Sequence, residues 1–110
     1  MAKIKEETKK IRQLHWYIFA DQKTWIEEQA NDGKTKSEVY RRVVDYISSN
    51  HTVREIKEYK EIDRDKDKDY ISLTSSQYSW ITSNFSNGTW ANALRKIIDI
   101  YKNSKQERKW

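Results

Sequence analysis

Hydrophobic and polar positions follow two periodicities along this chain, and each appears twice. Residues 70–74 alternate between polar and apolar side chains, the pattern of a half-buried strand, whereas residues 15–19 are apolar or aromatic throughout. Two later segments place apolar side chains at i, i+3, i+4 and i+7, which predicts helices with one continuous apolar face. These stripes are Tyr40, Val43, Val44 and Ile47, and then Leu94, Ile97, Ile98 and Tyr101.

The two stripes belong to an internal repeat. Trp25-Ile26 recurs as Trp80-Ile81, an offset of 80 − 25 = 55. Asp32-Gly33 recurs as Asn87-Gly88 at the same offset. From Arg41 onward the offset becomes 95 − 41 = 54, so one residue is missing from the turn after the second glycine. Matches in order, with one slip inside a loop, indicate a repeated structural unit. Each unit is expected to contain a strand, a helix, a glycine turn and a second helix.

The first helix of each unit is expected over residues 22–32 and 76–86. Gly33 and Gly88 stand where a glycine after a helix takes a left-handed conformation. The expected N-terminal caps are Asp21, either Ser75 or Ser76, and, for the second helix of the first unit, Ser37. The side chains expected on the inner side of the first helices are Trp25, Ile26, Gln29 and Ala30 in one unit and Tyr78, Trp80, Ile81 and Phe85 in the other.

The segment between the units has its own signals. Thr52-Val53-Arg54-Glu55 is a capping box, which predicts a linker helix to about residue 62. The alternating charges of residues 63–69 predict a charged turn before the second strand. The chain is thus expected to divide into a basic flexible arm (1–12), a first unit (13–48), a linker with a short helix (49–67), a second unit (68–103) and a C-terminal tail (104–110).

Composition narrows the classes of function. Lys plus Arg is 22 and Asp plus Glu is 17, so the net charge of +5 gives weak support to a polyanionic partner. The chain has no Cys, and neither His has a second ligand at metal spacing, so no disulfide and no metal site are expected. No catalytic motif appears, and neither an enzymatic activity nor a cofactor is expected. Without a membrane-spanning apolar run or a signal-peptide core, a cytoplasmic protein with no membrane contact is expected.

Two segments resemble a known family. Ser37-Glu38-Val39-Tyr40-Arg41-Arg42-Val43-Val44, after the Gly33 turn, resembles the Arc and MetJ type of ribbon-helix-helix repressor. Tyr70-Ile71-Ser72-Leu73-Thr74, before a helix, resembles the strand of the CopG type. The resemblance covers about residues 14–47 and 68–101. It implies a mainly α fold with one two-stranded antiparallel β-ribbon, in which two tandem ribbon-helix-helix units form an intramolecular pseudo-dimer, as in the TraY-like conjugation proteins.

Elementary physics agrees with such pairing. A single strand-helix-helix unit leaves an unpaired strand edge and an uncovered apolar helix face. Pairing two units removes both defects, and the linker of about twenty residues is long enough to allow it within one chain. Exchange of units between two chains stays open as an alternative.

The resemblance implies that double-stranded DNA is the partner, with the ribbon inserted in the major groove. If Ile71 and Leu73 point inward, the repeat offset places Trp16 and Ile18 inward as well; the alternative buried pair is Tyr17 and Phe19. The outward side chains would then contact bases, Gln at an adenine edge and Lys at guanine acceptors. The predicted base-contacting residues are Gln13, His15, Tyr17, Lys68, Tyr70 and Ser72.

A second set of contacts is expected at DNA phosphates. The resemblance implies that the N-terminus of each unit's second helix directs its amides and its dipole at a phosphate. The residues concerned are Lys34, Thr35, Lys36 and Ser37 in the first unit and Thr89 and Asn92 in the second, with Trp90 beside them. Simple solvation of Lys34 and Lys36 in a turn is the alternative.

Two functions therefore follow from the sequence. The first is a sequence-specific DNA-binding protein, either a transcriptional repressor or a plasmid or phage DNA-processing accessory. A second copy of the chain on DNA and a protein partner stay open as further partners. The alternative is a protein-binding module on the same scaffold, such as an antitoxin or an inhibitor of a host protein. That alternative depends on Trp90 and Trp110, which fall outside the apolar stripes and are expected to be exposed interface anchors.

Overall fold

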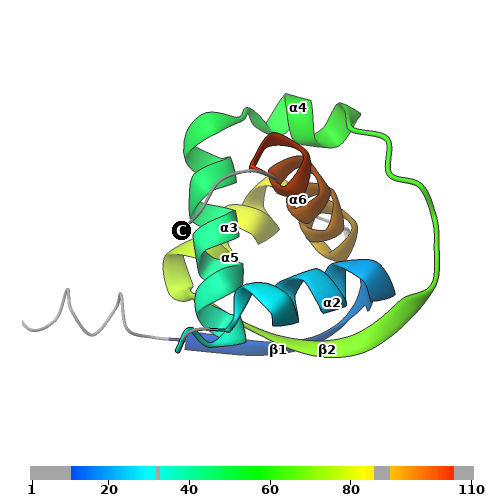
Figure 1. Ribbon diagram of the computed structural model, residues 1–110. Helices are drawn as coiled ribbons and strands as arrows, with labels where there is room; N and C mark the ends of the chain where they lie inside the picture. Colours follow the sequence, from blue (N-terminus) through cyan, green and yellow to red (C-terminus); the bar gives the residue numbers. More distant parts are fainter. Residues whose placement is uncertain (1–10, 32, 86–89, 106–110) are drawn as a thin grey trace, which may run out of the picture.

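The computed structural model describes residues 11–31, 33–85 and 90–105. This part of the chain is mostly helical and holds one two-stranded antiparallel sheet (Figure 1). The elements follow the predicted order, with the linker helix in the middle. They are β1 (Ile11–Phe19), α2 (Ala20–Gln29), α3 (Lys36–Asn50), α4 (Val53–Glu58), β2 (Lys66–Thr74), α5 (Ser75–Asn84) and α6 (Trp90–Lys105).

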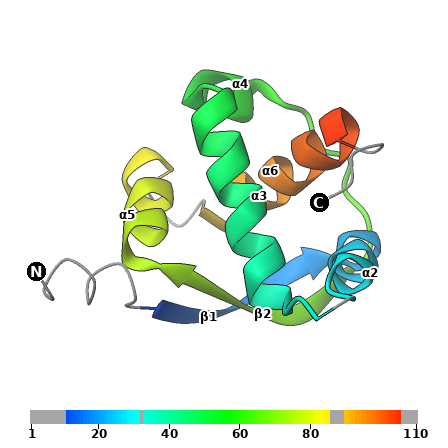
Figure 2. The same cartoon turned by 60° about the vertical axis from the view of Figure 1, so that its left-hand side comes forward.

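The two strands form a ribbon that carries all of the described helices on one of its faces (Figures 1 and 2). They pair along their whole length, from Ile11 opposite Thr74 to Phe19 opposite Lys66. α2 and α5 begin directly after β1 and β2, so these two helices lie at opposite ends of the ribbon (Figure 2). α4 lies on the far side of the molecule from the ribbon (Figure 1).

The strands are longer than the sequence predicts. The charged turn expected over residues 63–69 is wrong, because β2 begins at Lys66 and the amide of Ala20 donates to the carbonyl of Asp65 at 2.8 Å. Pairing with β1 satisfies the backbone of this segment, while Lys66, Asp67 and Lys68 keep their side chains in water. These three charged residues therefore enter the strand without being desolvated.

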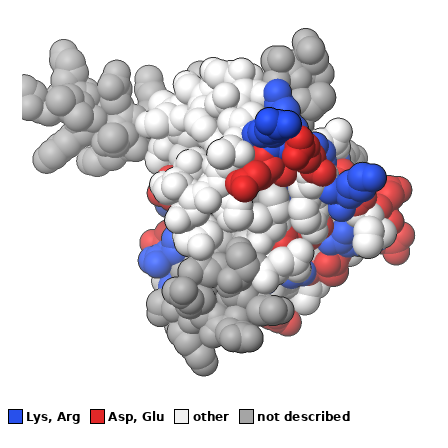
Figure 3. All heavy atoms as spheres, turned by 90° about the horizontal axis from the view of Figure 1, so that it is seen from above, with Lys and Arg blue, Asp and Glu red and all other residues white. Residues whose placement is uncertain are grey.

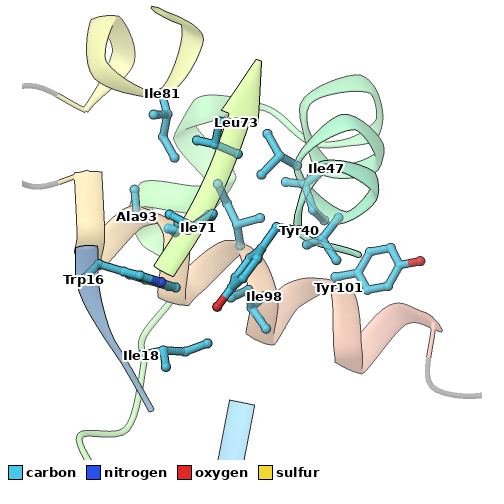
Figure 4. Packing of buried hydrophobic residues seen from close by; sticks show 14 of the residues in the cluster. Trp16, Ile18, Tyr40, Ile47, Ile71, Leu73, Ile81, Ala93, Ile98 and Tyr101 are labelled. Carbon is cyan, nitrogen blue, oxygen red and sulfur yellow. The ribbon is translucent and has the colours of Figure 1, made fainter. Parts of the chain in front are cut away.

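The inner face of the ribbon packs on the helices. Trp16 and Ile18 are buried, as are Ile71 and Leu73, so the strand faces predicted from the repeat offset are confirmed. Figure 4 shows these side chains meeting residues of the helices, among them Tyr40 and Ile98. Both predicted helix stripes lie in the same core. Trp25 and Trp80 are partly buried against it.

Phe19 is buried as well, although it shares the outward parity of Tyr17. It stands where the strand ends and α2 begins, so its ring leaves the strand's alternation. The guanidinium carbon of Arg64 lies 4.1 Å from the ring centroid, and that of Arg95 lies at 5.4 Å. These cations cover the ring at the end of the ribbon.

The predicted helix caps at Asp21, at Ser75 or Ser76, and at Ser37 are wrong. α2 begins directly after Phe19 without a side-chain cap, because a phenylalanine side chain has no hydrogen-bond acceptor. Thr74 and Thr35 cap α5 and α3 instead, each in a full capping box. The caps therefore lie one or two residues earlier than the serines. Gly33 has φ +85°, which confirms its predicted left-handed conformation; Gly88 lies outside the described residues.

The linker helix α4 has the predicted capping box, with the Thr52 hydroxyl accepting from the amide of Glu55. It ends at Glu58 rather than near residue 62. Beyond it, Arg64 donates to Asp21 at 2.9 Å and to Asp99 at 2.9 Å, which ties the linker to α2 and α6. The side-chain hydrogen bond from Arg64 is the main cause that lowers the pKa of Asp21.

Two glutamines at equivalent positions of the repeat connect the two halves of the chain. Each is buried in the first helix of its own half and donates to the second helix of the other half. The four hydrogen bonds run from Gln22 Nε2 to Arg95 O (2.8 Å) and Asp99 Oδ1 (2.8 Å), and from Gln77 Nε2 to Arg41 O (3.0 Å) and Asp45 Oδ1 (2.7 Å). The two glutamines are 55 residues apart in the sequence, and their acceptors, Arg41 with Arg95 and Asp45 with Asp99, are 54 apart. These are the two offsets of the repeat.

Candidate nucleic-acid interface

The outer face of the ribbon brings together all six predicted base-contacting residues. They form three directly opposed pairs across the two strands: Gln13 with Ser72, His15 with Tyr70, and Tyr17 with Lys68. None of the described helices crosses this face (Figures 1 and 2). Tyr17 and Tyr70 keep 53% and 58% of their surface exposed. Packing in the core therefore does not account for these two aromatic side chains.

The pairing type brings these side chains close together. The bond from Ala20 N to Asp65 O makes that pair a hydrogen-bonded one, and the alternation of an antiparallel ladder makes the three outer pairs non-hydrogen-bonded. Side chains of such pairs approach most closely. Accordingly, the rings of His15 and Tyr70 meet edge to face, with centroids 4.5 Å apart. The outer face is therefore a compact row of polar and aromatic groups.

The central pair also marks a near two-fold relation. His15 and Tyr70 are separated by 70 − 15 = 55, the repeat offset, and they are direct partners in the register. The same relation exchanges Gln13 with Lys68 and Tyr17 with Ser72, since each of these pairs is also 55 apart. The two ends of the outer face are thus equivalent in backbone and different in side chains.

Basic side chains from the helices hold the ribbon's edges. Arg95 donates to the carbonyl of Tyr17 at 2.6 Å, and Arg41, at the equivalent position, donates to the carbonyl of Ser72 at 3.5 Å. Lys23 donates to the carbonyl of Lys68 at 3.1 Å. All three bonds reach backbones of outer-face residues, so they position the face directly. This role is not predictable from the sequence pattern, although Arg41 and Arg95 open the repeated segment with the offset of 54.

Lys36, predicted to contact phosphate, is engaged inside the protein. Its Nζ lies 2.6 Å from Asp69 Oδ1, and the hydroxyl of Tyr40 donates to Asp69 Oδ2 at 2.7 Å. Asp69 is buried on the inner face, so these donors compensate a carboxylate removed from water. Burial, followed by the hydrogen bond to Asp69, raises the pKa of Tyr40.

The N-terminus of α3 lies beside the ribbon (Figure 2). The hydroxyl of Thr35 accepts from the amide of Glu38 in the capping box, so that hydroxyl is committed to the helix. Lys34 and Ser37 are half-buried. An open depression of about 600 Å³ lies here, in which basic and acidic side chains mix; it is lined by Gly33, Lys34, Glu38, Arg41, Arg42 and Asp45.

The N-terminus of α6 differs from that of α3. Trp90 is half-buried, and its ring stacks on Trp16 with centroids 6.2 Å apart. The expected exposure of Trp90 is therefore wrong, because the first turn of α6 packs on β1, whereas its role at a protein interface stays a prediction. The side chain of Asn92 is exposed and accepts from Arg95. Thr89 and Trp110 lie outside the described residues.

The face opposite the ribbon has a different character. Seen from the side of α4, it shows acidic and basic side chains next to one another (Figure 3). Arg54, for example, pairs with Glu58 at 3.0 Å. In the described segments no cluster of three or more His, Cys, Asp or Glu has the arrangement of a metal site, and no helix there has the length and apolarity to cross a membrane.

Comparisons with protein-family models, curated proteins and solved structures found no match to this chain. The interpretation of the outer face therefore depends on its own geometry.

Proposed function

We propose that the chain is a tandem ribbon-helix-helix protein whose two units pair within one molecule. The reciprocal bonds of Gln22 and Gln77 support this proposal, because each helix pair is completed by the other half of the chain. The coincidence of the repeat offset with the register at His15 and Tyr70 supports it independently. A pairing that unites two copies of one unit is expected to place equivalent residues about a common axis.

We further propose that this pseudo-dimer binds double-stranded DNA through the outer face of the ribbon. One observation carries the proposal: six outer side chains, five of them exposed and Ser72 half-buried, form three opposed pairs on a two-stranded ribbon whose other face holds the helices. The major groove is about 12 Å wide and admits a two-stranded ribbon, and it exposes a distinct donor and acceptor pattern for each base pair. Amide, hydroxyl, imidazole and ammonium groups are suited to that pattern.

Contacts to the DNA backbone are proposed to accompany the base contacts. The N-terminus of α3 would supply the free amides of its first turn beside Lys34. Arg41 and Arg95 keep the ribbon edges in place, so the outer side chains would meet the groove as a rigid set. The net charge of +5 adds a sequence-independent, salt-sensitive attraction.

The test is selection from a random duplex pool with the full chain, followed by a salt titration of the enriched sequence. Lys68→Ala removes a charge from the outer face, and we expect the affinity to fall about tenfold or more, since one good base contact is worth about 1–3 kcal/mol. Arg54→Ala is the matched control. It removes the same charge from α4, on the far side of the molecule, and its side chain is 84% exposed.

Specific binding that Lys68→Ala weakens far more than Arg54→Ala supports the proposal. An equal effect of the two variants would show attraction by net charge alone. No binding even at low salt would refute DNA recognition and favour the alternative of a protein-binding module, with Tyr17 and Tyr70 as its exposed aromatics. A transcriptional regulator and a plasmid or phage DNA-processing accessory would both use the proposed binding.

A further inference from the structure

The two ends of the outer face differ in chemistry although their backbones are equivalent. One end carries Gln13 opposite Ser72, an amide and a hydroxyl without charge. The other carries Tyr17 opposite Lys68, a phenol ring and an ammonium group. The near two-fold axis through His15 and Tyr70 exchanges these two ends, so a palindromic target would place unlike groups on like bases.

On the basis of the proposed DNA binding, we infer that the chain recognises a non-palindromic site in a single orientation, with an A·T-containing half under the Gln13 end and a G·C-containing half under the Lys68 end. The amide of Gln13 can donate to adenine N7 and accept from adenine N6 at the same time. The ammonium of Lys68 only donates, and guanine offers two adjacent acceptors, O6 and N7, in the major groove.

The surroundings of each end strengthen the difference. At the Lys68 end, Asp67 is paired with Lys23 at 3.6 Å, which offsets the acidic side chain next to Lys68. Lys23 also holds the carbonyl of Lys68, so the backbone beneath the ammonium is fixed. At the Gln13 end, Arg41 holds the carbonyl of Ser72. Side chains of the helices thus hold the strand backbone at both ends of the outer face. We therefore expect neither end of the ribbon to change its backbone conformation on entering the groove.

The orientation can be measured because the chain has no Cys, so one introduced thiol is unique. Thr24 on α2 and Ser79 on α5 occupy equivalent positions, since 79 − 24 = 55, and both are exposed. α2 lies at the Lys68 end of the ribbon and α5 at the Gln13 end (Figure 2). A DNA-cleaving iron chelate attached to Thr24→Cys or Ser79→Cys would therefore report which flank of the bound site each end faces.

The expected result with the selected duplex is cleavage at one flank by the Thr24→Cys conjugate, beside the G·C-containing half, and at the other flank by the Ser79→Cys conjugate. Gln13→Ala should relax base preference by about tenfold only on the Ser79 side, and Lys68→Ala only on the Thr24 side. Cleavage of both flanks by each conjugate, a palindromic selected site, or the reverse assignment of the halves would overturn the inference and leave DNA binding intact. Failure to bind any duplex would instead refute the proposed function itself.

Discussion

The two hydrogen bonds that Gln22 donates to α6 are expected to contribute strongly to the stability of the fold. Its Nε2 donates to the carbonyl of Arg95 and to the carboxylate of Asp99, both at 2.8 Å and both buried. Gln22→Met keeps the shape of the side chain and removes both bonds. A neutral hydrogen bond contributes about 1 kcal/mol and a charge-assisted one about 2 kcal/mol. Asp99 keeps a partner in Arg64, so it is not left unpaired.

Part of this loss is offset. The Oε1 of Gln22 is buried and has no hydrogen-bond partner among the described residues, so its removal recovers about 1 kcal/mol. The net expectation is a decrease of about 2 kcal/mol in the free energy of unfolding. Urea denaturation followed by tryptophan fluorescence measures it, and with an m value of about 1 kcal/mol per M the midpoint should fall by about 2 M.

Gln13→Met is the matched control, because it makes the same replacement at an exposed position. It should change the free energy of unfolding by no more than about 0.5 kcal/mol. If Gln22→Met proves as stable as Gln13→Met, the bonds between the two halves contribute nothing measurable, and the reasoning from buried hydrogen bonds fails here.

Three further predictions concern stability. Tyr40→Phe removes one of the two donors to buried Asp69 and should cost about 2 kcal/mol in urea denaturation, whereas an unchanged midpoint would mean that Lys36 alone suffices. Arg64 lowers the pKa of Asp21, so the stability that this pair adds is present above the ordinary aspartate pKa of about 3.9 and is lost as the pH falls below it. The difference in the free energy of unfolding between the wild type and Arg64→Leu should therefore shrink below about pH 4. A difference that stays constant with pH would contradict the pairing. Gly33→Ala should cost about 1 kcal/mol in thermal unfolding through backbone strain at φ +85° alone, because a Cβ there meets no atom within 4 Å; a stabilised variant would show that the turn adopts another conformation.

The repeat made the strand faces predictable where periodicity alone did not. Residues 15–19 are apolar or aromatic throughout, so their own pattern allows either face to be inward. The clear alternation of Ile71 and Leu73, transferred by the offset, selected Trp16 and Ile18, and the structure buries both. The outward residues of the candidate interface follow from the same step.

The features that the sequence did not reveal depend on contacts between distant segments. Asp69 looks like part of a charged turn, and only the donors of Lys36 and Tyr40, about thirty residues away, explain its burial. Trp90 falls on no apolar stripe, and only β1 supplies Trp16 as its stacking partner. The charged start of β2 forms because β1 offers a backbone partner, which no local propensity records.

The antiparallel pairing of β1 with β2 inside one chain has a consequence for dosage. When a ribbon is assembled from two separate polypeptides, dilution favours their dissociation. The concentration of the assembled ribbon then falls faster than the concentration of the protein. Here the covalent connection through residues 20–65 keeps both strands at a fixed effective concentration. The ribbon is thus expected to stay assembled on dilution, with an amount proportional to that of the protein.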